Sequence, residues 1–281
     1  MSRCRTSVVG AGAMGCGIAH VFALHGHPVH LVDVSAAALE RALVSIRRNL
    51  DRQGVAQPED ILRRIVSFSD LHEGVAHADL VIEAVPEDAA LKQTVFTRLD
   101  AAAPAHAVLA SNTSSISIAS LASATARPEQ VIGMHFFNPV PVMKLVEVVR
   151  GPATSEATFE QVFRLARDLG KEPVEVRDAP GFVSNRVLMP MINEACRCVM
   201  EGVASPESVD KVMTLGMRHP MGPLALADFI GLDVCLSIME VLYEGLDDDR
   251  YRPCSLLREM VDAGRLGRKS GRGFYDYDAA S

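Results

Sequence analysis

The stretch Thr6-Ser7-Val8-Val9-Gly10-Ala11-Gly12-Ala13-Met14-Gly15, residues 6–15, decides the fold of this chain. A short apolar strand runs directly into the pattern G-x-G-x-x-G, and a helix-like stretch follows it. In such a turn the first glycine permits the tight bend, the second lets the backbone approach a pyrophosphate, and the third lets the helix pack on the strand. The first N–H groups of the helix then face the phosphates. We therefore expect a dinucleotide site whose contacts include Gly10, Gly12, Ala13, Met14 and Gly15.

The second strand-like segment, residues 28–33, ends at Asp33. A carboxylate at this point can accept hydrogen bonds from the adenosine ribose hydroxyls of a dinucleotide. It would repel a 2′-phosphate, and the following Val34-Ser35 supplies no arginine to compensate. We therefore expect NAD rather than NADP as the cofactor. The alternative, a tight turn that binds no ligand, is disfavoured because the turn lies between a strand and a helix near the start of the chain.

Strand-like and helix-like segments alternate over the first part of the chain. Further strands are expected at 79–85, 107–110, 131–134 and 145–149, and Ser35 has the chemistry of an N-cap for the helix after the second strand. This alternation predicts an α/β fold with right-handed crossovers, a Rossmann-type doubly wound parallel sheet over residues 1–180.

Beyond Asp178-Ala179-Pro180-Gly181 the β-branched clusters end, and apolar residues fall at helical spacing. We expect an all-helical second domain over residues 181–281, with a kink at Pro190. Many apolar helical faces in only about 100 residues make a small independent core. This domain is therefore expected to contribute to the substrate cleft and to form a homodimer interface.

Composition excludes several classes of protein. The 281 residues carry a formal net charge of −7, which gives no electrostatic reason to expect nucleic acid or an anionic membrane as a partner. The six cysteines contain no C-x-x-C pair, and the histidines do not complete a ligand spacing, so no metal site is expected. The N-terminus lacks a signal-peptide hydrophobic region, and no apolar run approaches the roughly 20 residues that span a bilayer. We expect a soluble cytoplasmic protein.

His135 and Glu147 are the candidate acid–base residues. His135 follows a strand and precedes the Pro-rich turn Phe136-Phe137-Asn138-Pro139, although a lone histidine is more often structural. Glu147 interrupts the apolar run 145–149, and a buried carboxylate needs a cationic or donor partner. A His–Glu pair meets that need and holds a general base in one orientation. A solvent-facing position for Glu147 is the alternative.

With these residues in place, the chain resembles the L-3-hydroxyacyl-CoA dehydrogenase family, and most closely its short bacterial members that act on 3-hydroxybutyryl-CoA. The resemblance covers nearly the whole chain. Its motifs are Gly10–Gly15, Ser111-Asn112-Thr113-Ser114-Ser115, His135–Pro141, Pro180-Gly181-Phe182-Val183-Ser184-Asn185-Arg186, Pro220-Met221-Gly222-Pro223 and Gly271-Arg272-Gly273-Phe274-Tyr275.

The resemblance implies a role for each matching residue. His135 would be the catalytic base and Glu147 its partner, and Ser114 and Asn185 would hydrogen-bond the reacting oxygen. Asn138 would shape the substrate pocket. Glu87 and Lys92 match positions near the nicotinamide ribose of NAD, and Asn112 would also lie close to the cofactor.

The implied reaction is reversible, NAD-linked oxidation of a 3-hydroxyacyl-CoA thioester to the 3-ketoacyl thioester. The chain departs from the long-chain mitochondrial relatives, which carry a lysine-rich insertion where residues 47–64 hold arginines interleaved with acidic residues. The acyl carrier is therefore open between CoA and an acyl-carrier protein. A non-catalytic NAD-binding or structural protein is a further alternative, disfavoured because the acid–base residues are present.

Overall fold

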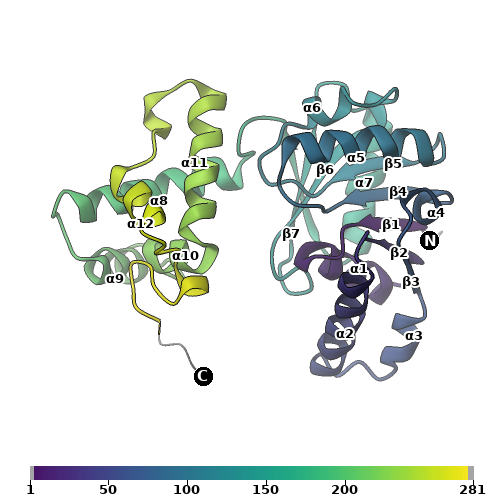
Figure 1. Cartoon of the computed structure of the whole chain (residues 1–281), viewed down its shortest axis with the longest axis horizontal. Coiled ribbons are helices and arrows are strands. Elements are labelled where there is room, and N and C mark those ends of the chain that lie inside the picture. Colours follow the sequence, from purple (N-terminus) through teal and green to yellow (C-terminus); the bar gives the residue numbers. More distant parts are fainter. Residues whose placement is uncertain (1–2, 278–281) are drawn as a thin grey trace. The chain divides into compact units, whose positions relative to one another are not determined.

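Two compact units, which divide between Ala179 and Pro180, make up the computed structural model (Figure 1). The structure describes residues 3–277. We call residues 3–179 the first unit and residues 180–277 the second unit. Each unit has its own cluster of buried apolar side chains.

The first unit is built on an eight-stranded sheet with the order β3-β2-β1-β4-β5-β6-β7-β8. The order reverses between β1 and β4, and the carboxyl ends of strands at such a switch point are where open α/β sheets bind ligands. The sheet confirms the Rossmann-type α/β fold expected from the sequence. The strands are β1 Thr6–Val9, β2 Val29–Val32, β3 Ile65–Phe68, β4 Leu80–Glu83, β5 Val108–Ser111, β6 Val131–Phe136, β7 Leu145–Arg150 and β8 Glu172–Arg177.

The pair β6–β7 is antiparallel, which departs from the fully parallel sheet expected from the sequence. Only residues 137–144 connect the two strands, whereas parallel neighbours need a crossover of about a dozen residues or more. The edge strand β8 could not be predicted from a run of apolar residues, because Val176 is its one fully buried residue. The edge strand β3 is likewise half exposed.

Helices cover both faces of this sheet. Alternate strand residues such as Val8 and Ile82 pack with α1, α2 and α7 in one apolar cluster, whereas α4, α5 and α6 contact one another in sequence along the sheet. Ser35 caps α2 by accepting the Ala38 N–H, as the sequence predicts. The helices are α1 Ala13–Leu24, α2 Ala36–Arg52, α3 Pro58–Leu62, α4 Leu71–Val75, α5 Ala89–Ala102, α6 Ile118–Ala122 and α7 Glu156–Asp168, with a 3₁₀ turn η1 at Pro128–Gln130.

The second unit is helical, as expected from the sequence. Its longest helix, α8, continues through Pro190. None of the helices within residues 3–277 is long and apolar enough to cross a lipid bilayer. The elements are α8 Ser184–Met200, α9 Pro206–Gly216, α10 Pro223–Ile230, α11 Leu232–Leu246, η2 Asp249–Tyr251, α12 Ser255–Asp262 and η3 Arg268–Ser270.

A buried carboxylate on α10 holds the chain that follows η3. Asp228 is 0% exposed and accepts hydrogen bonds from the N–H groups of Phe274 and Tyr275 and from the Tyr277 hydroxyl, all at 3.0 Å. A Cβ on Gly273 would overlap the Asp228 carboxylate, so only glycine lets the chain pass so close. The segment Gly271–Tyr275 therefore completes the second unit by satisfying a buried charge.

Candidate active site

The glycine turn between β1 and α1 uses its three glycines for different reasons. Gly10 has a φ of 107°, and a Cβ there would lie 2.6 Å from the Ala84 carbonyl oxygen. A Cβ on Gly15 would overlap the carbonyl oxygen of Gly10. Gly12 differs because a Cβ there would meet no protein atom within 4 Å. The turn therefore leaves open space beside Gly12, at the N-terminus of α1, and this space fits a dinucleotide pyrophosphate.

Asp33 lies directly after β2, beside this turn. One of its carboxylate oxygens accepts the Ala11 N–H at 2.7 Å, and the other accepts the Ser35 N–H at 2.8 Å. These bonds fix the carboxylate between the glycine turn and the N-terminus of α2. Each carboxylate oxygen has a further lone pair, so Asp33 keeps acceptor capacity for the ribose hydroxyls of NAD.

His135 and Glu147 face each other across β6 and β7. The antiparallel register places them directly opposite, and His135 Nδ1 lies 2.7 Å from Glu147 Oε2. His135 is 7% exposed and Glu147 is 2% exposed, so the carboxylate is buried rather than solvent-facing. An ionised carboxylate only accepts hydrogen bonds, so in this contact the imidazole hydrogen is on Nδ1. The pair thus orients the ring with Nε2 as its second functional atom.

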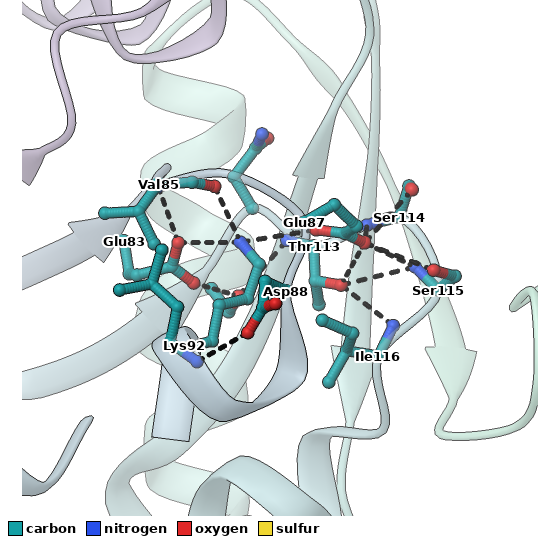
Figure 2. Close-up of polar contacts among 12 residues, drawn as sticks. Glu83, Val85, Glu87, Asp88, Lys92, Thr113, Ser114, Ser115 and Ile116 are labelled. Carbon is teal, nitrogen blue, oxygen red and sulfur yellow. Dashed lines mark hydrogen bonds and ion pairs between the residues drawn. The ribbon is translucent and has the colours of Figure 1, made fainter. Parts of the chain in front are cut away.

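The Ser111–Ile116 segment, which we call the serine loop, is organised by the carboxylate of Glu87 (Figure 2). Glu87 Oε1 accepts the Thr113 hydroxyl at 2.6 Å and the N–H groups of Ser114 at 2.8 Å and Ser115 at 3.1 Å. Its burial acts to raise the pKa of Glu87. The Lys92 ammonium and the Thr113 hydroxyl favour the charged form more strongly, so the pKa lies below its ordinary value. Ser114 is therefore held by an ionised carboxylate.

Lys92 lies beneath this loop with its ammonium surrounded by acceptors. Its Nζ is 2.7 Å from Glu83 Oε1, 3.1 Å from the Val85 carbonyl oxygen and 3.3 Å from Glu87 Oε2. The side chain is 1% exposed, so its link to the cofactor end of the site runs through Glu87, whose side chain is 37% exposed. The sequence reasoning singled out Lys92 and Glu87 but missed Glu83. The signal was present, because Glu83 interrupts an apolar run as Glu147 does.

Hydrogen bonds hold the turn after β6 on both of its sides. Before it, Asn112 Oδ1 accepts the Phe136 N–H at 2.9 Å, which joins the serine loop to the residue after His135. Beyond it, the buried Lys171 ammonium donates to the carbonyl oxygens of Val140 at 2.5 Å and Met143 at 2.8 Å. Burial lowers the pKa of Lys171. No pattern in the sequence marks Lys171, because a single lysine after a helix has no local signature.

The two remaining predicted site residues are Asn138 and Asn185. Asn138 is exposed in the turn after β6 and precedes a cis peptide bond to Pro139. Asn185 lies in the first turn of α8 in the second unit and is 8% exposed. The first unit therefore brings together the glycine turn, Asp33, Glu87, Lys92, Asn112, Ser114, His135 and Glu147 at the carboxyl ends of β1, β2, β4, β5 and β6 and on β7.

Known proteins match the chain over nearly its full length. The family model "3-hydroxyacyl-CoA dehydrogenase, NAD binding domain" matches residues 5–179, and "3-hydroxyacyl-CoA dehydrogenase, C-terminal domain" matches residues 181–277. A probable 3-hydroxybutyryl-CoA dehydrogenase of Bacillus subtilis is 58% identical and matches over 96% of each chain. The human mitochondrial hydroxyacyl-coenzyme A dehydrogenase is 41% identical over 96% of this chain and 90% of its own. A solved (S)-3-hydroxybutyryl-CoA dehydrogenase from Ralstonia eutropha superposes with a TM-score of 0.95 at 48% identity, over 99% of this chain and 100% of its own.

Proposed function

The chain belongs to the 3-hydroxyacyl-CoA dehydrogenase family, and from this membership we propose that it catalyses the reversible oxidation of 3-hydroxybutyryl-CoA to the 3-ketoacyl thioester. It is an NAD-dependent oxidoreductase, as the family is. The observation that carries the reaction is the buried contact between His135 and Glu147 in the sheet that also bears the glycine turn. Relatives named for 3-hydroxybutyryl-CoA, at 58% and 52% identity, support this thioester as the substrate.

Residues of the first unit support binding of the pyrophosphate, the adenosine ribose and the nicotinamide end of NAD. The open space beside Gly12 would take the pyrophosphate, and Asp33 would accept from the adenosine ribose. Glu87, with Lys92 behind it, and Asn112 would line the nicotinamide end. When bound, NAD supplies the hydride acceptor.

His135 is the general acid–base residue of the proposed reaction. In the oxidation direction His135 Nε2 takes the hydroxyl proton of the substrate, and in the reverse direction the imidazolium returns it. Glu147, 2.7 Å from Nδ1, stabilises the imidazolium that forms and keeps the ring from turning. Ser114 donates to the reacting oxygen. Resemblance to the family assigns the same role to Asn185, and it assigns Asn138 to the substrate pocket. Such a base and such electrostatic support each contribute about 10²–10⁴-fold.

One assay tests this function against its alternatives. Wild-type protein is given 3-hydroxyacyl-CoA thioesters of increasing chain length, and the same acyl groups on an acyl-carrier protein, with NAD and with NADP. We expect NADH formation with the highest kcat/KM for the four-carbon CoA thioester. A higher kcat/KM for the carrier-protein thioester would place the enzyme in a biosynthetic route. Absence of turnover with every thioester would favour the alternative that the chain is a non-catalytic NAD-binding protein.

The second unit supports the proposal of a homodimer. Several of its large apolar side chains are exposed, among them Leu215 at 73% and Val203 at 70%. Burying such side chains between two copies removes apolar surface from water. Light scattering at micromolar concentration is expected to report a dimer mass, and a fully active monomer would contradict the interface.

The six cysteines are free thiols, which supports a reducing compartment such as the cytoplasm.

A further inference from the structure

Glu83 is a buried carboxylate for which the proposed reaction has no use. It is the last residue of β4 and is 0% exposed. Its Oε1 accepts the Lys92 ammonium and the Val85 N–H, each at 2.7 Å, and its Oε2 accepts the Ser111 hydroxyl at 2.7 Å. Burial raises the pKa of Glu83, and Lys92 and Ser111 oppose that rise. A buried charge of this kind is costly unless every partner is in place.

Two chains of contacts run from Glu83 to the serine loop (Figure 2). In the first, Ser111 Oγ donates to Glu83 and accepts the Thr113 N–H at 3.1 Å. In the second, Lys92 bridges Glu83 to Glu87 Oε2, and Glu87 Oε1 receives the Thr113 hydroxyl at 2.6 Å. Thr113 is 0% exposed and is thus held at its amide by one chain and at its hydroxyl by the other.

The Thr113 hydroxyl sets the shape of the rest of the loop. It accepts the N–H groups of Ser115 at 3.3 Å and Ile116 at 2.9 Å, so the two residues after Ser114 depend on its position. Thr113 itself precedes Ser114, so the backbone is held on both sides of Ser114. The loop is also tied to the residue after His135 through Asn112. Contacts that begin at Glu83 therefore contribute to the position of Ser114 relative to His135.

We infer that Glu83 is a positioning residue for catalysis, acting through Ser111, Lys92 and Glu87 to hold the Ser114 hydroxyl in its productive place. This inference rests on the proposed function, because it assigns Ser114 to the reacting oxygen. The charge of Glu83 is the active feature. With it, the ammonium of Lys92 is shared between two carboxylates. Without it, Glu87 is the one carboxylate left beside this ammonium, and the carboxylate that holds the loop is drawn toward Lys92.

The test is a double-mutant cycle on the full-length protein with Glu83→Gln and Ser114→Ala. Gln keeps the shape of Glu83, can accept from Lys92 and can donate to Ser111, so the variant is expected to fold. We expect Glu83→Gln to lower kcat about tenfold to a hundredfold, since displacements of about 1 Å near reacting groups have effects of this size. KM for the thioester and the affinity for ADP-ribose, which lacks nicotinamide, are expected to stay near wild type.

In the Ser114→Ala background, Glu83→Gln is expected to lower kcat by about threefold or less, because the group that it positions is gone. An equal loss in both backgrounds would overturn the inference and leave Glu83 a structural residue. The matched control is Asp100→Asn, on the same helix as Lys92, which removes a carboxylate paired with Arg127 at 2.7 Å. It is expected to lower thermal stability without lowering kcat.

If Glu83→Gln fails to fold, Ser111→Ala takes its place in the cycle, since it breaks only the first chain of contacts. It is expected to give a smaller loss of kcat that also disappears in the Ser114→Ala background, and a loss that persists there overturns the inference. Failure of the proposed function has a different signature. Wild-type protein would then show no turnover of any 3-hydroxyacyl thioester, whereas failure of the inference leaves wild-type turnover intact.

Discussion

Gly12 and Gly15 lie in one turn but under different physical constraints. A Cβ on Gly15 would overlap the backbone of Gly10, whereas a Cβ on Gly12 meets no protein atom within 4 Å. We expect Gly15→Ala to lower the free energy of unfolding by about 3 kcal/mol. Gly12→Ala should lower it by about 1 kcal/mol or less, yet weaken NAD binding at least about tenfold by filling the pyrophosphate space. Urea unfolding and NAD titration of both variants check this, and tight NAD binding by Gly12→Ala would contradict the assignment.

His135 and Glu147 give a prediction about rate. His135→Gln is expected to lower kcat about 10³-fold with NADH binding intact, because the expected pyrophosphate contacts lie on the glycine turn. Glu147→Gln keeps the shape but removes the charge, and should lower kcat about 10²-fold. Steady-state kinetics and NADH titration of both variants measure these effects.

The control for this pair is Glu175→Gln, which removes an exposed carboxylate on the neighbouring strand β8 and should leave kcat unchanged. Wild-type kcat in Glu147→Gln would show that Glu147 is only a structural carboxylate.

We expect Asp33 to determine the preference for NAD over NADP. Its carboxylate would repel a 2′-phosphate, and the next residue, Val34, is 90% exposed, so an arginine fits there without disturbing the core. We expect the double variant Asp33→Ser, Val34→Arg to shift the ratio of kcat/KM values toward NADP by about 10²-fold. Steady-state kinetics with both cofactors measure the ratio. Equal kcat/KM values of the wild-type enzyme with NADP and with NAD would contradict this role of Asp33.

At the scale of elements, an ion pair ties the start of β1 to the start of β4. The Arg5 guanidinium meets Asp79 at 2.7 Å and 3.2 Å, and the Arg5 N–H donates to the same carboxylate at 2.9 Å. The side-chain bonds from Arg5 hold the pKa of Asp79 well below its ordinary value. A depressed pKa in the folded state contributes stability above the unfolded value of about 3.9, and this stability is lost as the pH falls below it.

We therefore expect Asp79→Asn to lower the free energy of unfolding by about 1 kcal/mol at pH 7, since Arg5 is half exposed. The difference between variant and wild type should shrink as the pH falls below about 4. Thermal unfolding of both proteins at neutral and acid pH gives the comparison. A difference that grows on acidification would show that the ion pair is not its source.

At the scale of the molecule, the two units have separate cores, and their aromatic residues allow them to be followed separately. There is no Trp, and the four tyrosines are all in the second unit, at 243, 251, 275 and 277. The N–H groups of Phe274 and Tyr275 donate to different oxygens of Asp228, so the amide N–H₂ of Asp228→Asn must face one of these donors. The change should destabilise the second unit by about 2–3 kcal/mol.

In urea, the tyrosine fluorescence transition of Asp228→Asn is expected to move to lower concentration. Hydrogen exchange of peptides from residues 3–179 should keep its wild-type denaturant dependence, because the first unit has a core of its own. Exchange that accelerates equally in both units would mean that they unfold as one cooperative body.

Much of the fold and part of the site could be predicted from local patterns. The glycine turn, the position of Asp33 and the Ser35 cap each lie within a few residues along the chain, where backbone geometry and side-chain chemistry act directly. The alternation of strands and helices is also local, because each element has its own period of apolar residues. The helical second unit follows from the same kind of pattern.

The sequence by itself therefore determined the fold class and the cofactor, and it predicted His135 and Glu147 as an acid–base pair. Tertiary structure alone decided the antiparallel register that sets His135 opposite Glu147, the burial of Lys92 between Glu83 and Glu87, and the anchoring of the turn after β6 by Lys171. The physical reason is that these contacts join neighbouring strands and helices that are distant along the chain. Their neighbourhood is set by the order of strands in the sheet, and no local period of residues encodes that order.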